Sequence, residues 1–177
     1  HGADGASDAI GKGADALNGA IKEVRRLSHD LRPGALDDLG LSAALEALTH
    51  NFAERTGIKV TLEAVAFKNM LLPEARTALY RVAQEALNNI DRHANASEVT
   101  LALSSPHGRV QMVIVDNGRG FSRDSGTKRG LGLRNMAERM AHFGGTMVVE
   151  PSPNGTTLRA TLPKSVFIRQ SKLAEVA

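Results

Sequence analysis

The sequence predicts a two-layer α/β sandwich preceded by a long helix. Short apolar runs bounded by turn residues alternate along the chain with segments in which apolar residues recur every three or four positions, a pattern of strands mixed with amphipathic helices. Apolar residues make up 42% of the 177 positions, enough for one buried core. We therefore expect a mixed sheet with helices on one face.

The composition excludes several classes of protein. The chain has no Cys, so disulfides and thiolate metal sites are impossible. Its net charge is +3, with basic residues scattered among acids and no array of aromatic residues, which argues against nucleic-acid binding. No apolar run approaches the ~18 residues of a membrane span, and no signal peptide opens the chain. We expect a soluble piece cut from a longer protein.

Residues 8–33 form the predicted long helix. Its apolar positions follow alternating steps of four and three, the heptad seam of a helix that packs in a bundle or coiled coil; they are Ile10, Ala14, Leu17, Ile21 and Val24. The alternative is a helix lying on the chain's own core. Pro33 and Gly34 end it.

Residues 34–56 are predicted to hold a connecting segment and a second helix. Ser42 is the expected N-cap, and Gly57 the expected end. Leucines 41, 45 and 48 fall on one face of this helix and should be buried.

Residues 57–163 carry the sandwich itself. We expect strands at 58–64, 99–103, 110–115, 146–150 and 156–162, and helices at 73–93 and 130–143. Pro73 suits a helix start, and the buried stripe of that helix is Ala78, Val82, Leu87 and Ile90. Residues 104–108 form one hairpin loop, and Asn154-Gly155 should supply the positive φ angles of another. Residues 164–177 form a tail without a recognisable pattern.

Glu85 and Asn89 are the candidate catalytic residues. They lie four positions apart and therefore share one face of their helix. An Asn on the inward side of an otherwise apolar helix must find a partner. Mg²⁺ prefers oxygen ligands and takes only one or two from protein, so the Asn89 side-chain oxygen suits a single Mg²⁺ contact. The alternative is a solvated helix end.

Asp116 follows the apolar strand at 110–115, which is too apolar to lie at an edge. A buried carboxylate at a strand end can accept a hydrogen bond from the exocyclic amine of adenine, which guanine lacks at that place. Gly118 and Gly120 would allow the backbone to approach the base without a Cβ clash. In isolation the same residues read as an ordinary Asp-Asn-Gly turn.

Residues 122–129 are polar and contain Gly126, which is typical of a mobile loop, here a short lid. Gly130-Leu131-Gly132-Leu133 then opens a helix whose free N–H groups would face phosphates. The pattern lacks the third glycine of a dinucleotide fingerprint, and the chain contains no P-loop.

Residues 85–94, 116–121 and 130–133 together resemble the N, G1 and G2 boxes of sensor histidine kinases, within the wider group that includes Hsp90, gyrase B and MutL. Leu31-Arg-Pro33, followed by Leu36-Asp-Asp-Leu-Gly, resembles the second dimerisation helix and joint of the nitrate-sensor, DesK and DegS-like subfamily. The resemblance implies the ATP-binding fold of this group for residues 57–163 and part of the dimerisation region for residues 8–33.

The resemblance also implies roles. Arg92 and His93 would approach the nucleotide phosphates, and Thr156 and Thr157, in the last box, would bind near the adenine. The implied ATP-binding set is Asn89, Arg92, His93, Asp116, Gly118, Gly120, Gly130, Leu131, Gly132, Leu133, Thr156 and Thr157. The expected cofactors are ATP and Mg²⁺. The expected partners are the receiver domain of a response regulator and a second copy of the full-length chain. The resemblance also implies a cytoplasmic location, with a full-length parent that would reach the inner membrane only through N-terminal regions absent here.

One departure concerns the phosphate acceptor. His29-Asp30 precedes Leu-Arg-Pro, which matches the second dimerisation helix rather than the helix that bears the acceptor histidine. We therefore expect the acceptor helix to be absent and the fragment not to autophosphorylate. Two alternatives to a histidine kinase are an ATPase or serine kinase of the same group and a non-catalytic nucleotide-binding module.

Overall fold

The structure is a computed structural model that describes residues 36, 39–67, 70–120 and 131–168. Gly34–Ala177 form one compact unit. The predicted helix at 8–33 falls in the other unit, His1–Pro33, and lies outside the described residues. Within the described ranges, no helix is long and apolar enough to cross a membrane.

Five strands form one mixed sheet, as predicted. They are β1 (Lys59–Ala64), β2 (Glu98–Ser104), β3 (Val110–Asp116), β4 (Thr146–Ser152) and β5 (Gly155–Leu162). Their order across the sheet is β1-β2-β3-β5-β4. Strand β1 runs parallel to β2, while every other pair is antiparallel. The apolar strand β3 occupies the centre, so its end lies inside the sheet rather than at an edge.

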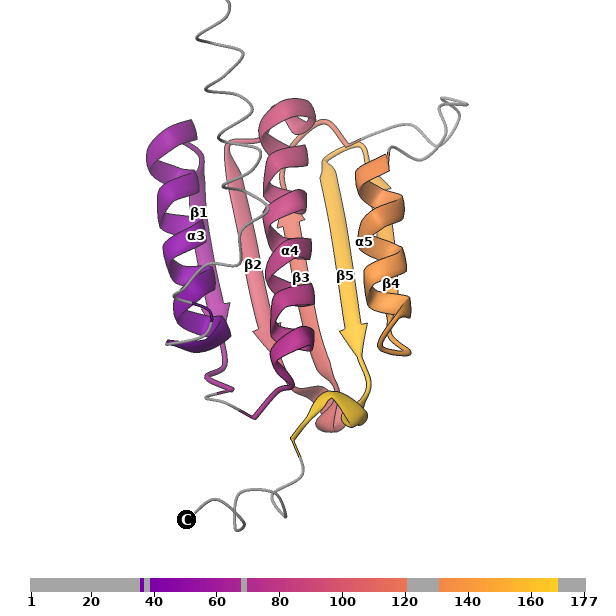
Figure 1. The fold of residues 1–177 in the computed structure, drawn as a ribbon. Helices are drawn as coiled ribbons and strands as arrows, with labels where there is room; N and C mark the ends of the chain where they lie inside the picture. The colour runs from indigo at the N-terminus through magenta and orange to yellow at the C-terminus, as the bar shows by residue number, and fades with distance from the viewer. Residues whose placement is uncertain (1–35, 37–38, 68–69, 121–130, 169–177) are drawn as a thin grey trace, which may run out of the picture. The chain divides into compact units, whose positions relative to one another are not determined.

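Three helices cover one face of this sheet, which confirms the two-layer sandwich (Figure 1). They are α3 (Gly40–Thr56), α4 (Pro73–Asn89) and α5 (Leu131–Ala141). Helix α4 contacts both α3 and α5 and therefore lies between them. This central helix carries most of the residues predicted to act in a site.

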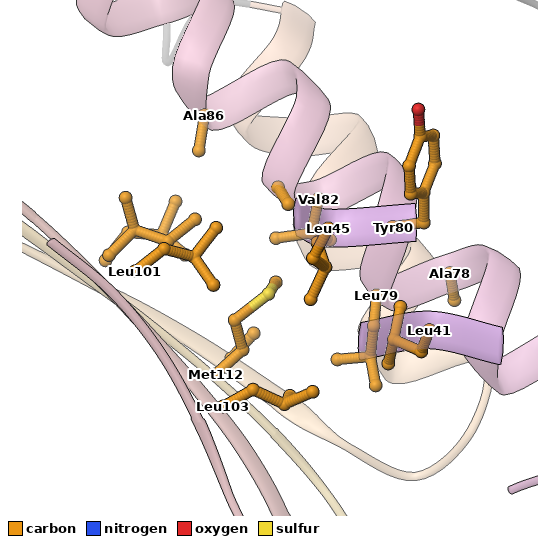
Figure 2. Close-up of a cluster of buried hydrophobic side chains, with 14 of the residues drawn as sticks. Leu41, Leu45, Ala78, Leu79, Tyr80, Val82, Ala86, Leu101, Leu103 and Met112 are labelled. Carbon is orange, nitrogen blue, oxygen red and sulfur yellow. The ribbon is translucent and has the colours of Figure 1, made fainter. Parts of the chain in front are cut away.

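The core fills the space between α4 and the strands. Figure 2 shows Leu101, Leu103 and Met112 rising from the sheet toward Val82 and Ala86 of α4. These five side chains are at most 5% exposed. Each buried leucine contributes about 1.5–3 kcal/mol relative to an exposed one. The residues predicted for the buried stripe of α4 and for the buried face of α3 are buried or packed against the core; they are Ala78, Val82, Leu87, Ile90, Leu41, Leu45 and Leu48.

The predicted N-cap of α3 is wrong. The helix begins at Gly40, and Leu39 occupies the N-cap position without a side-chain hydrogen bond. The Ser42 hydroxyl instead donates to the carbonyl of Val65 at 3.1 Å, tying the helix to the chain that leaves β1. The predicted end is confirmed: Gly57 has a φ of 72° and ends the helix.

The turn between β4 and β5 differs from the predicted one. Ser152 pairs with Gly155, so Pro153 and Asn154 form the two-residue turn. Gly155 has a φ of 131°, whereas Asn154 does not have a positive φ. Proline at the second position and glycine at the fourth favour a type I turn, which explains why Asn154 and Gly155 do not form its centre.

The start of the tail packs onto the core, which the sequence did not indicate. Val166 is 2% exposed, and its carbonyl accepts a hydrogen bond from the Leu72 N–H at 2.9 Å. The Ile168 N–H donates to the Met70 carbonyl at 2.8 Å. These bonds hold the segment that leads into α4 and close the end of the core opposite the candidate site.

Candidate functional site

The described candidate residues gather at one end of the sandwich. This end comprises the last turns of α4, the π-helical turn η1 (Ile90–Ala94), the end of β3 and the starts of β5 and α5 (Figure 1). Gly130 and the predicted lid at 122–129 lie outside the described residues.

Glu85 faces the first turn of α5. A Cβ on Gly132 would overlap the Glu85 carboxylate, so the two helices approach closely at this point. Asn89 lies one turn beyond Glu85 on the same side of α4 and is the last residue of the helix. Both side chains are half-buried. The contact with Gly132 places Glu85 on the side of α4 that faces α5, and Asn89 shares that side through its spacing of four residues.

The end of α4 is not the continuous α-helix that the sequence predicted. The α-helix ends at Asn89, and η1 continues the chain as a π-helical turn that carries Arg92 and His93. Asn95 ends this turn with a φ of 52°, a left-handed conformation that Asn tolerates. Both Arg92 and His93 are exposed. Isolated π-helical turns are rare and occur frequently at functional sites.

Asp116 is a buried acid at the end of the central strand. It is 5% exposed, and its Oδ1 accepts a hydrogen bond from the Gly118 N–H at 2.9 Å. A buried charge is costly unless hydrogen-bonded. The Gly118 bond fixes the carboxylate through one oxygen, and the other oxygen remains a suitable acceptor for a ligand N–H.

The two glycines after Asp116 are required for close packing. A Cβ on Gly118 would overlap the backbone carbonyl of Ala94, and a Cβ on Gly120 would overlap the carbonyl of Ser152. Gly120 also has a φ of 61°, which favours glycine. The loop after β3 is thus pressed between η1 and the β4–β5 turn.

The sheet register separates the two candidate threonines. Thr156 lies opposite Asp116, and Thr157 lies opposite Val115. Directly opposed residues share one face of an antiparallel pair, and Val115 is 39% exposed on the face away from the helices. Thr156 therefore lies beside Asp116, whereas Thr157 belongs to the other face of the sheet.

Two further residues shape the site. Asn117 Oδ1 accepts hydrogen bonds from the N–H groups of Ser97 and Glu98, each at 2.9 Å, which ties the loop to the start of β2. Gly155 lies against the backbone carbonyl of Asp116, leaving no space for a Cβ. The Asp-Asn-Gly and Asn-Gly patterns marked both positions as turns but did not reveal these contacts.

Helix α5 presents its first turn at this end of the domain. Leu131 is 74% exposed, while Leu133 packs against the core and anchors the turn. The N–H groups in the first turn of a helix have no partner within it and suit an anionic ligand.

Comparison with known families places residues 74–166 within the family described as "Histidine kinase-, DNA gyrase B-, and HSP90-like ATPase". This match covers α4 from its second residue, η1, β2 to β5 and α5, and thus every described candidate residue.

Two curated proteins are similar to the chain. "Sensor histidine kinase MctS" of Rhizobium johnstonii is 56% identical over 177 residues, covering 98% of this chain and 38% of that protein. "Signal transduction histidine-protein kinase/phosphatase DegS" of Brevibacillus brevis is 36% identical over 148 residues, covering 83% of this chain and 38% of that protein. The chain thus spans well under half the length of these relatives.

A solved structure shares the fold. The histidine kinase domain of the blue-light activated histidine kinase from Erythrobacter litoralis EL346 matches with a TM-score of 0.62 and 24% identity, covering 71% of this chain and 61% of that one. This similarity confirms the α/β fold predicted from the sequence.

Proposed function

Because the chain belongs to the histidine kinase-, DNA gyrase B- and HSP90-like ATPases, and within them to the sensor histidine kinases, we propose that it holds Mg²⁺-ATP between α4 and α5 and serves as the catalytic half of a kinase. The observation that carries this proposal is the buried carboxylate of Asp116, which the Gly118 N–H fixes beside Thr156 at the end of the sandwich where the candidate residues gather.

Asp116 would recognise the adenine. Its free carboxylate oxygen would accept a hydrogen bond from the exocyclic amine, while Thr156, opposite it on the same sheet face, would contact the base nearby. The charged acceptor makes this bond stronger than one between neutral groups. Guanine carries a carbonyl instead of this amine, so its oxygen would face the carboxylate and GTP would bind poorly.

The phosphates would extend along α4 toward α5. The first-turn N–H groups of α5 supply donors to an anion, and Arg92 and His93 supply positive or hydrogen-bonding groups from η1. The described residues contain no group of three His, Cys, Asp or Glu that could hold a metal by themselves. An ion bound there would take one oxygen from Asn89 and most of its ligands from phosphate and water, which suits Mg²⁺.

The proposed reaction moves the γ-phosphoryl group of ATP to an imidazole nitrogen of an acceptor histidine. A phosphorus–nitrogen bond forms, the bond between the γ-phosphorus and the bridging oxygen breaks, and ADP leaves. In this proposal, Glu85 and Asn89 would orient the γ-phosphate and its metal. The phosphoryl group would then pass to an Asp in the receiver domain of a response regulator. The longer protein would act as a dimer in the cytoplasm.

The domain limits follow the same proposal. Residues 57–163 would form the catalytic domain, 34–56 the connection to it, and 8–33 the second dimerisation helix, with 164–177 as a tail. The acceptor histidine would lie on a preceding helix, so the chain needs an acceptor supplied from outside.

Binding and transfer measured separately test the proposal. We expect ATP affinity to require Mg²⁺ and to exceed GTP affinity by at least tenfold, the value of one charge-assisted hydrogen bond of about 1.5 kcal/mol. Labelled phosphate should pass from ATP to an added fragment that carries the acceptor helix. Binding without transfer would indicate a non-catalytic nucleotide module, and release of free phosphate without the fragment would indicate an ATPase.

A further inference from the structure

Arg119 closes the end of η1 with two hydrogen bonds. Its backbone N–H donates to the carbonyl of Ala94 at 2.8 Å, and its Nε–H donates to the carbonyl of His93 at 2.9 Å. The last carbonyls of a helix have no partner within that helix, and a cation near them complements the helix dipole. Arg119 thus acts as a cap contributed from the loop after β3.

The capped turn carries both candidate phosphate-binding side chains. Arg92 and His93 are exposed, so neighbouring side chains do not fix their directions; the backbone of η1 does. A π-helical turn is a rare conformation, and here the two bonds from Arg119 hold its last carbonyls. On its other side, Asp91 accepts a bond from Arg55 of α3 at 2.7 Å.

We propose that Arg119 is a positioning residue of the ATP site: its guanidinium holds the backbone of η1 so that Arg92 and His93 point toward the phosphates. This inference rests on the proposed function. It assigns Arg119 no contact with the nucleotide. The base-binding group, Asp116, is fixed by the Gly118 N–H and not by the Arg119 side chain.

Because Arg119 would act on the phosphate side of the site and not on the base side, its loss should lower the affinity only for ligands that carry phosphates. In Arg119→Gln, the affinity for ADP should fall roughly tenfold, as for one lost charge-assisted bond, while adenosine affinity should stay within about twofold. Both can be measured by displacement of a fluorescent ATP analogue from the 177-residue chain. The variant keeps the backbone bond to Ala94 and should remain folded, which circular dichroism would verify.

Arg109→Gln is the matched control. Arg109 is also exposed but lies before β3, at the other end of the sandwich. Its loss changes net charge equally and should leave both affinities unchanged. Equal losses of ADP and adenosine affinity in Arg119→Gln would overturn the proposal, because they would indicate general damage to the site.

A double-mutant cycle separates positioning from direct contact. If Arg119 acts through the side chains of η1, adding Arg119→Gln to Arg92→Gln/His93→Gln should cause no further loss of ADP affinity. A further loss of about tenfold would mean that Arg119 binds the phosphates itself and would overturn the assignment. Failure of the proposed function is distinguishable, because the unaltered chain would then not bind ATP.

Discussion

The Glu85 carboxylate lies directly against the α-carbon of Gly132, closer than a Cβ at that position would allow. This contact joins the two helices on either side of the proposed nucleotide. Gly132 therefore controls where the Glu85 side chain rests.

Gly132→Ala should separate activity from stability. The clashing atom is the end of a flexible side chain, so Glu85 can swing aside and the unfolding free energy should change by less than about 1 kcal/mol. The displaced carboxylate should slow phosphoryl transfer by roughly 10- to 100-fold. Urea denaturation and transfer of labelled phosphate to an acceptor-helix fragment measure the two effects.

The control uses Glu85→Ala, which removes the clashing group. Adding Gly132→Ala to this variant should slow transfer no further. A full additional loss would show that the alanine acts on something other than Glu85.

Gly155→Ala should destabilise the fold. The new Cβ would overlap the backbone carbonyl of Asp116, and φ is 131°. We expect a loss of about 2 kcal/mol or more, from conformational strain together with displaced backbone. Gly57→Ala is the matched control, because its φ is 72° with no atom within 4 Å of the new Cβ. If denaturation showed the same loss of unfolding free energy in both variants, the contact with Asp116 would not contribute to the destabilisation.

Asp116→Asn should weaken ATP binding by about 1.5–3 kcal/mol. The amide oxygen can still accept the Gly118 N–H, but the amide nitrogen is a donor and would face the donor amine of adenine. Asn89→Asp should also weaken binding, because it replaces the neutral amide proposed to contact Mg²⁺ with a negative charge beside the phosphates. Calorimetry should find an unchanged ATP affinity for Glu98→Gln, a control at an exposed residue. If all three folded variants bound ATP equally well, Asp116 and Asn89 would not belong to the ATP site.

Tyr80 should ionise above the ordinary range of tyrosine. Burial raises its pKa, and the charge of Arg81 offsets this only in part. The hydroxyl points away from the sheet (Figure 2). Because the chain has one Tyr and no Trp, the ultraviolet absorbance change that accompanies tyrosine ionisation reports this group alone.

The raised pKa of Tyr80 makes the stability of the fold depend on pH in the alkaline range. The folded pKa lies above the unfolded value of 10.0, so the neutral side chain contributes stability below that pH, and this contribution is lost as pH rises through the folded pKa. In Tyr80→Phe, the unfolding free energy should therefore decrease less as the pH rises through the alkaline range. A titration midpoint at or below that of the unfolded chain would contradict the burial argument.

The chain should not phosphorylate itself. His29 precedes Leu-Arg-Pro, in the segment that we propose to be the helix after the acceptor, and reacting atoms must approach within ~3–3.5 Å. Incubation with γ-labelled ATP and Mg²⁺ should leave no acid-labile label. Label that disappears in His29→Gln would identify His29 as the acceptor.

The sequence predicted the helices and strands better than their ends and the turns between them. Alternating and helical periods located the five strands and the helices α3, α4 and α5, because burial of one face imposes its period on the residues. Ser42 failed as an N-cap because the chain enters α3 earlier and its hydroxyl bonds to Val65 instead. The π-helical turn η1 carries no sequence signature, since it depends on bonds from Arg119 and Arg55 in distant segments.

By itself, the sequence determined the two-layer fold, the buried acid at the end of a central strand and the shared face of Glu85 and Asn89. Each follows from the spacing of apolar and polar residues along short stretches of the chain. Only the tertiary structure decided that Thr156 rather than Thr157 joins Asp116, that Gly132 rests on Glu85 and that Arg119 caps η1. Strand register and contacts between distant segments set these relationships, and a one-residue shift in register would reverse the choice of threonine.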